Sequence, residues 1–207
     1  MIKWLFFDLG GTVYDETFSD KQRIDGLIEK AQLDIAYSDF YAEMQKSAAE
    51  FAPSPFSAAR GKFGIKDNVP YSNEKEILYP NAVEVIKKLS EKYRLGIIAN
   101  QPPNTDERLK NDGLYDLFEI CLLSECVNLF KPDMAFFECA FEEAGCNPYE
   151  AVMIGDRLDN DVFPAKSVGM KTVRVVQGLY SVQCARSDEY AADYEITKLE
   201  GLIDIDF

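Results

Sequence analysis

The chain has 207 residues, which suits one compact domain with a small insertion, and its formal net charge is −14. A strongly acidic protein repels polyanions, so we expect neither nucleic acid nor an anionic membrane as a partner. Histidine is absent, and this excludes Ser-His-Asp catalysis, Cys-His catalysis and histidine-ligated metals.

The cysteines and the apolar segments indicate in which cellular compartment the protein is located. The five cysteines show no close pairing and fit reduced thiols better than a disulfide framework. The opening apolar stretch ends at Asp8, which is too early for a signal-peptide core, and no later run approaches membrane-spanning length. We therefore expect a cytoplasmic protein.

The first half of the chain predicts one strand followed by a helical segment. Residues 2–7 are apolar and aromatic apart from one lysine, and they lead to a pair of glycines, as a buried strand would. Residues 15–79 are more polar and are predicted to form several short helices. Within them, Ile24, Leu27 and Ile28 have helical spacing.

From residue 80 onward, strands and helices alternate. The apolar runs predict strands at 95–99, 119–123, 151–154, 171–176 and 194–196, with helices at 80–93, 106–112, 132–144 and 159–168. Short connections between alternating elements favour parallel strands with helices on both faces. The predicted fold class is therefore α/β, with a Rossmann-like, doubly wound and mainly parallel sheet. Residues 1–14 and 80–207 would form this core, and residues 15–79 a small helical cap inserted after the first strand.

Acidic residues follow two of the predicted strands. Asp8 is followed by two glycines after the first strand, and Gly155-Asp156 ends a later one, with Asp161 five residues on. Each feature alone has an ordinary explanation, because Asp and Gly are common in turns and acidic residues stabilise helix N-termini. Strand ends of an open parallel sheet meet at one crevice, however, where these carboxylates would repel one another without a cation. Carboxylate oxygens, water and phosphate are typical Mg²⁺ ligands, and Lys131 would add further positive charge.

The order of these residues closely resembles the four motifs of the haloacid dehalogenase (HAD) superfamily, and its phosphatases in particular. The resemblance covers nearly the whole chain. It implies that Asp8 is the nucleophile that takes the phosphoryl group and that Lys131 holds both the nucleophile and the phosphate. It implies a phosphate contact at Gly11 and a Mg²⁺ site formed by Asp8, the backbone carbonyl of Gly10, Asp156 and Asp161.

The chain departs from this family pattern at two positions. Gly10 stands where the family has a second Asp, its general acid and base, and Ala99 stands where it has a Ser or Thr that binds the phosphoryl group. Asn100, one residue further on, offers an amide that could partly replace the hydroxyl. Losing a general acid removes roughly 10²–10⁴ in rate, and losing one charge-stabilising donor removes roughly 10²–10³. We therefore expect reduced activity, with the smallest deficit for substrates with good leaving groups.

The sequence favours a Mg²⁺-dependent phosphatase that acts on a small phosphorylated metabolite through an aspartyl-phosphate on Asp8. Asp15, Asp159 or a residue of the cap are candidates for activating the hydrolytic water. One alternative is a sensor or scaffold that binds phosphoryl groups without turnover. Another is a metal-independent 2-haloacid dehalogenase, for which the pair Asp156 and Asp161 would be unnecessary. The sequence does not specify the substrate.

Overall fold

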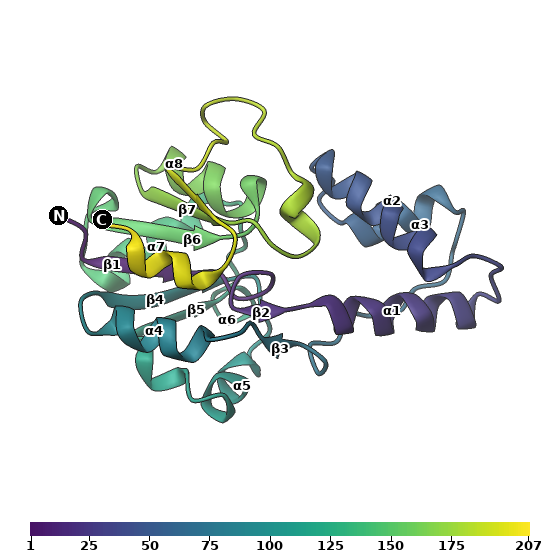
Figure 1. The fold of residues 1–207 in the computed structure, drawn as a ribbon, viewed down its shortest axis with the longest axis horizontal. Helices are drawn as coiled ribbons and strands as arrows, with labels where there is room; N and C mark the ends of the chain where they lie inside the picture. The colour runs from purple at the N-terminus through teal and green to yellow at the C-terminus, as the bar shows by residue number, and fades with distance from the viewer.

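Six parallel strands form the central sheet of the molecule, in the order β5-β4-β1-β6-β7-β8 (Figure 1). The computed structural model describes residues 1–207. The strands are β1 (Trp4–Phe7), β4 (Arg94–Ala99), β5 (Ile120–Leu123), β6 (Ala151–Gly155), β7 (Lys171–Val175) and β8 (Tyr194–Ile196). The predicted α/β class and parallel sheet are confirmed, including the last strand.

Helices cover both faces of this sheet. One face carries α4 (Ala82–Ser90), α5 (Thr105–Asn111) and the 3₁₀ segment Leu199–Asp204. The other face carries α7 (Met134–Ala144) and α8 (Phe163–Ser167). No helix of the chain combines the length and apolar character that crossing a membrane requires.

Strand β1 is buried on both faces, which explains its continuous apolar sequence. Leu5 and Phe7 enter the core beneath α4, whereas Trp4 and Phe6 enter the core beneath α7. From β1 the chain builds outward through β4 and β5, then returns to place β6 on the other side of β1. The order of the strands reverses between β1 and β6, and in open α/β sheets such a reversal opens a crevice at the carboxyl ends of the strands.

Three helices stand apart from the sheet, beyond the carboxyl ends of its strands and opposite the two chain termini (Figure 1). We refer to residues 15–79 as the helical insert; it contains α1 (Thr17–Lys30), α2 (Tyr37–Ala49) and α3 (Pro55–Lys62). A small antiparallel pair, β2 (Tyr14–Asp15) with β3 (Ile77–Leu78), lies where the chain enters and leaves it. The insert has its own apolar core, to which the 3₁₀ segment Leu179–Val182 contributes Leu179.

Two helices differ from their predicted forms. The helix predicted at 132–144 begins only at Met134, because Asp133 is its N-cap and accepts a hydrogen bond from the Ala135 amide at 3.0 Å. The helix predicted at 159–168 is divided into a π-helical turn, Leu158–Val162, and α8. Pro164 lacks the amide hydrogen that a continuous α-helix would need at that position, and this accounts for the break.

Gly96 provides a test of packing within the sheet. It pairs with Phe6 across β1 and β4, and a Cβ atom at Gly96 would overlap the Phe6 ring. We expect Gly96→Ala to lower the free energy of unfolding by about 1–3 kcal/mol. Gly61→Ala, at an exposed position of α3 with open space around it, should raise that free energy by about 0.5–1 kcal/mol. Urea unfolding followed by circular dichroism measures both, and equal midpoints would contradict the packing argument.

Candidate active site

Asp8 and Asp156 lie on either side of the point where the strand order reverses. Asp8 continues β1, and its amide donates to the carbonyl of Ile154 in β6 at 2.9 Å. Asp156 follows the last residue of β6. The close approach of the two loops depends on Gly11, which has a φ of +68° and whose Cβ would overlap Oδ2 of Asp156.

Lys131 joins two carboxylates from separate loops. Its Nζ lies 2.7 Å from Oδ1 of Asp8 and 2.5 Å from Oδ1 of Asp161, and its side chain is only 2% exposed. Burial lowers the pKa of Lys131, but Asp161 and Asp8 outweigh this effect and raise the pKa overall. The ammonium group therefore stays charged at the centre of the site.

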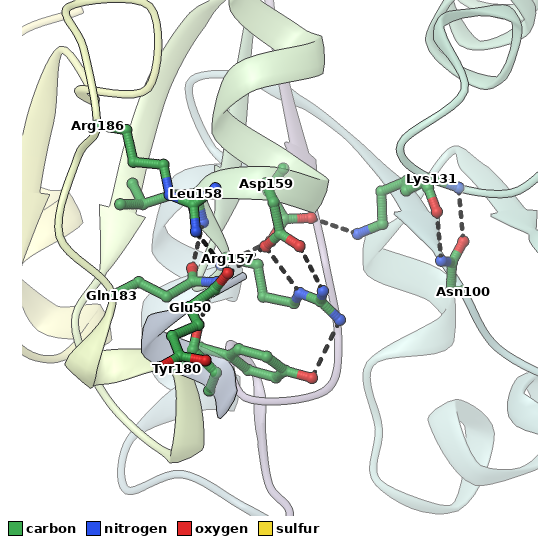
Figure 2. A network of polar contacts seen from close by, with 11 residues as sticks. Glu50, Asn100, Lys131, Arg157, Leu158, Asp159, Tyr180, Gln183 and Arg186 are labelled. Carbon is green, nitrogen blue, oxygen red and sulfur yellow. Dashed lines mark hydrogen bonds and ion pairs between the residues drawn. The ribbon is translucent and has the colours of Figure 1, made fainter. Parts of the chain in front are cut away.

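Asn100 fixes the backbone of Lys131 (Figure 2). Its Oδ1 accepts a hydrogen bond from the Lys131 amide at 2.8 Å, and its Nδ2 donates to the Lys131 carbonyl at 2.9 Å. The side-chain amide that the sequence offered for phosphate binding is thus already engaged in positioning the lysine. Ala99 packs its methyl group into the core beneath the site.

Asp156 is the carboxylate with no compensating partner. Both of its oxygens are buried without a hydrogen bond, and it can bring a ligand atom within 4.8 Å of those of Asp8 and Asp161. Burial, followed by the charges of Asp161 and Asp8, raises the pKa of Asp156 well above its ordinary value. Burial likewise raises the pKa of Asp161 to about 6, although Lys131 opposes that rise. A buried, unpaired carboxylate among other acidic oxygens is a donor set that fits a hard divalent cation such as Mg²⁺.

A polar network beside the cluster ties the loop after β6 to the insert (Figure 2). Arg157 pairs with Asp159 through Nη2 and Oδ2 at 2.6 Å and donates from Nη1 to the Tyr180 hydroxyl at 3.0 Å. Gln183 accepts from the Leu158 amide at 2.8 Å and donates to the carbonyl of Ala48 in α2 at 3.3 Å. Burial opposes the ionisation of Asp159, but the Arg157 guanidinium holds its pKa below the ordinary value.

Two cavities lie above the carboxylates. The smaller, of about 140 Å³, is lined by Asp8, Gly10, Lys131 and Asp156 among others. The larger, of about 670 Å³, lies between the core and the insert. Four residues line both cavities: Glu16, Asn100, Gln101 and Tyr180.

Sequence reasoning did not single out three of the residues that line both cavities, namely Glu16, Gln101 and Tyr180. Gln101 follows a predicted strand, which is a weak signal for a crevice residue. Glu16 and Tyr180 carry no comparable signal, because their positions depend on a turn and on docking of the insert. Burial, followed by the charges of Glu76 and Asp20, raises the pKa of Glu16 well above its ordinary value.

Comparison with known proteins establishes the family. The model of haloacid dehalogenase-like hydrolases matches residues 2–169. The chain belongs to this family of enzymes. It is 29% identical over 225 residues to a glyceraldehyde 3-phosphate phosphatase of Methanocaldococcus jannaschii, covering 99% of this chain and 97% of the relative. It is 30% identical over 224 residues to the protein of the same name from Pyrococcus furiosus, covering 99% and 92%. A crystal structure of a HAD phosphatase from Thermococcus onnurineus superposes with a TM-score of 0.67 at 29% identity, covering 98% and 97%.

The carboxylate cluster of this HAD hydrolase should destabilise the metal-free fold. In EDTA, we expect Asp156→Asn to raise the free energy of unfolding by roughly 1 kcal/mol, because it removes an unpaired buried charge. Asp159→Asn is the matched control, and we expect it to lower that free energy by roughly 1–3 kcal/mol, because Arg157 would lose its partner. Thermal unfolding of both variants measures this difference, and a destabilised Asp156→Asn would contradict the assigned repulsion.

Proposed function

We propose that this hydrolase is a Mg²⁺-dependent phosphatase that acts on small phosphorylated metabolites through an aspartyl-phosphate on Asp8. The observation that carries the proposal is the contact between Asp8 and Lys131 at 2.7 Å, at the floor of a cavity beside the unpaired carboxylate of Asp156. The relatives named glyceraldehyde 3-phosphate phosphatases support the same reaction class.

Asp8 is the nucleophile in this proposal. Lys131 contacts Oδ1 of Asp8, so the other carboxylate oxygen is available for in-line attack on phosphorus. Lys131 then neutralises part of the charge on the phosphoryl oxygens, which its raised pKa permits at neutral pH. Gly11 lets the backbone approach the phosphoryl group closely.

The metal ligands in this proposal are the carboxylates of Asp8, Asp156 and Asp161 together with the backbone carbonyl of Gly10. Bound Mg²⁺ would neutralise phosphoryl charge and orient the substrate. Asp156 contributes most, because both of its oxygens are free of protein partners. Asp161 already contacts Lys131 through Oδ1 and accepts from the Arg157 amide through Oδ2 at 2.9 Å, so it also anchors the lysine.

The helical insert would serve as a cap over the site. The larger cavity has a size typical of small-molecule pockets, and its walls come from both the insert and the core. The phosphoryl group would occupy the smaller cavity and the remainder of the metabolite the larger one. Enclosure by the insert would exclude bulk water and select the substrate.

The carboxylate cluster favours the phosphatase over the metal-independent dehalogenase. A reaction without metal gains nothing from a buried Asp156 that has no partner, and that residue opposes folding. A sensor that only binds phosphoryl groups would likewise gain nothing from directing the carboxylate of Asp8 at the ligand, since that charge repels phosphate.

Release of inorganic phosphate from acetyl phosphate and p-nitrophenyl phosphate tests the reaction. We expect turnover with Mg²⁺ and none in EDTA. Asp8→Asn should lower kcat by about 10⁴-fold or more, because the nucleophile is lost. Asp116→Asn changes an exposed Asp away from the cavities and should leave kcat unchanged. Equal rates in wild type and Asp8→Asn would rule out the assigned nucleophile.

Thermal unfolding tests the metal site without turnover. At Mg²⁺ concentrations about 100 times Kd, we expect stabilisation of the wild type by about 2.7 kcal/mol. Asp156→Asn should lose this gain, whereas Asp116→Asn should keep it. An undiminished gain in Asp156→Asn would place the ion elsewhere.

A further inference from the structure

The carboxyl group of Glu16 occupies the space into which a side chain at position 10 would extend. A Cβ atom built on Gly10 would overlap Oε1 of Glu16 and lie 2.9 Å from its carboxyl carbon. We propose that Glu16 is the catalytic acid and base of this enzyme, in place of an acidic side chain at position 10. This inference rests on the phosphatase function proposed above.

A tight turn brings Glu16 back to Gly10. The amides of Val13 and Tyr14 both donate to the Leu9 carbonyl, at 2.8 and 2.9 Å, and the Gly11 amide donates to the Tyr14 carbonyl at 2.8 Å. The chain therefore reverses direction within a few residues of the nucleophile. Glu16 follows as the N-cap residue of α1 but forms no side-chain cap bond, so its carboxyl group is free to point toward the site.

Glu16 lies where the leaving group would depart. It lines the smaller cavity together with Asp8, and it also lines the larger cavity. In the proposed binding mode, the bond between phosphorus and the leaving oxygen spans the boundary of these cavities. A carboxyl group at that boundary is placed to give a proton to the leaving oxygen and later to receive one from water.

The surroundings of Glu16 suit a carboxyl group that carries a proton. It forms no ion pair, and its polar contact is with the Tyr71 hydroxyl, 3.2 Å from Oε1. That hydroxyl lies closer to Oε1 of Glu76, at 2.7 Å. Tyr71 has a single hydroxyl hydrogen, so it can donate to only one of these two carboxyl groups at a time, and the contact to Glu76 is the shorter. While that hydrogen is donated to Glu76, a protonated Glu16 can donate to the Tyr71 oxygen.

The other two acids considered for this role are engaged elsewhere. Asp15 accepts hydrogen bonds from the amide and the hydroxyl of Thr17, and it lines neither cavity. Asp159 is paired with Arg157 and also accepts from Gln183 at 3.0 Å. Neither residue is available to exchange protons with a substrate above Asp8.

The proton balance of the reaction follows from this placement. Asp8 forms a bond to phosphorus as the bond to the leaving oxygen breaks, and Glu16 transfers its proton to that oxygen, giving an alcohol. Glu16, now a carboxylate, then takes a proton from water as the water oxygen attacks phosphorus. The acyl phosphate bond breaks, Asp8 returns as a carboxylate, inorganic phosphate leaves, and Glu16 is again protonated.

Leaving-group dependence separates this role from a structural one. Protonation matters for the alkoxide of glycerol 3-phosphate and little for p-nitrophenolate. We expect Glu16→Gln to lower kcat/KM for glycerol 3-phosphate by about 10²–10⁴-fold and that for p-nitrophenyl phosphate by less than about 10-fold. The control Glu29→Gln, at an exposed position of the same helix, should change neither. Equal losses on both substrates, or no loss, would overturn the proposal.

A relocated carboxyl group gives a second test. The backbone at Gly10 does not adopt a positive φ, so a side chain fits there once Glu16 is shortened. We expect Gly10→Asp/Glu16→Ala to regain most of the kcat/KM for glycerol 3-phosphate that Glu16→Ala loses. A folded double variant with no recovery would count against equivalence of the two positions and overturn the proposal.

The phosphorylated enzyme reports on the second half of the reaction. With p-nitrophenyl phosphate, Glu16→Gln should accumulate protein carrying one phosphoryl group, seen by intact-mass spectrometry after acid quench, because the step that needs a base is slowed. Wild type should show little of this species, and a Glu16→Gln variant that accumulates no more than wild type would overturn the assigned base. A wild type no faster than Asp8→Asn would instead show that the phosphatase function itself is wrong.

Discussion

The buried ammonium group of Lys131 is the interaction on which the site depends. It holds Asp8 and Asp161, which come from loops at different strands, within ion-pair distance, and the side chains of Lys131 and Asp161 are almost fully buried. Taking such charges out of water opposes folding unless each is compensated. One ammonium group cannot compensate three carboxylates, so Asp156 is left without a partner. A further cation would compensate Asp156, and this is the physical basis of the metal site proposed above.

Glycines set how closely the acidic groups approach one another. A Cβ atom at Gly11 would overlap Asp156, and one at Gly155 would overlap Asp161. Any larger residue at these positions would therefore push a carboxylate out of the cluster. Gly10 belongs to the same pattern, but there the space is filled by Glu16 from outside the loop. The short loop after β1 accordingly positions one acid directly and leaves room for a second one from the insert.

The sequence predicts the sheet well because buried parallel strands leave an unambiguous pattern. The continuous apolar run ending in Phe6 and Phe7 reflects burial on both faces of β1, and the rule that strand ends converge brings Asp8 and Asp156 together. Features that depend on tertiary packing could not be predicted in this way. The division of the predicted helix at Pro164 into a π-helical turn and α8 depends on packing around the site, and the return of Glu16 to Gly10 depends on a turn whose direction local sequence does not specify. A comparison of motifs shows that no acid stands at position 10, but it does not show which side chain fills the space beside Gly10.

If Glu16 is the acid, its location makes the chemistry depend on the helical insert. A carboxyl group at position 10 would be held by β1 alone. Glu16 is instead the N-cap residue of α1, whose Leu27 packs in the apolar core of the insert together with Leu179, which follows β7 in the chain. Tyr71, the hydrogen-bond partner of Glu16, also belongs to the insert. The proton donor, its hydrogen-bond partner and one wall of the larger cavity therefore all belong to the insert, so the placement of the insert over the sheet also sets the position of the acid.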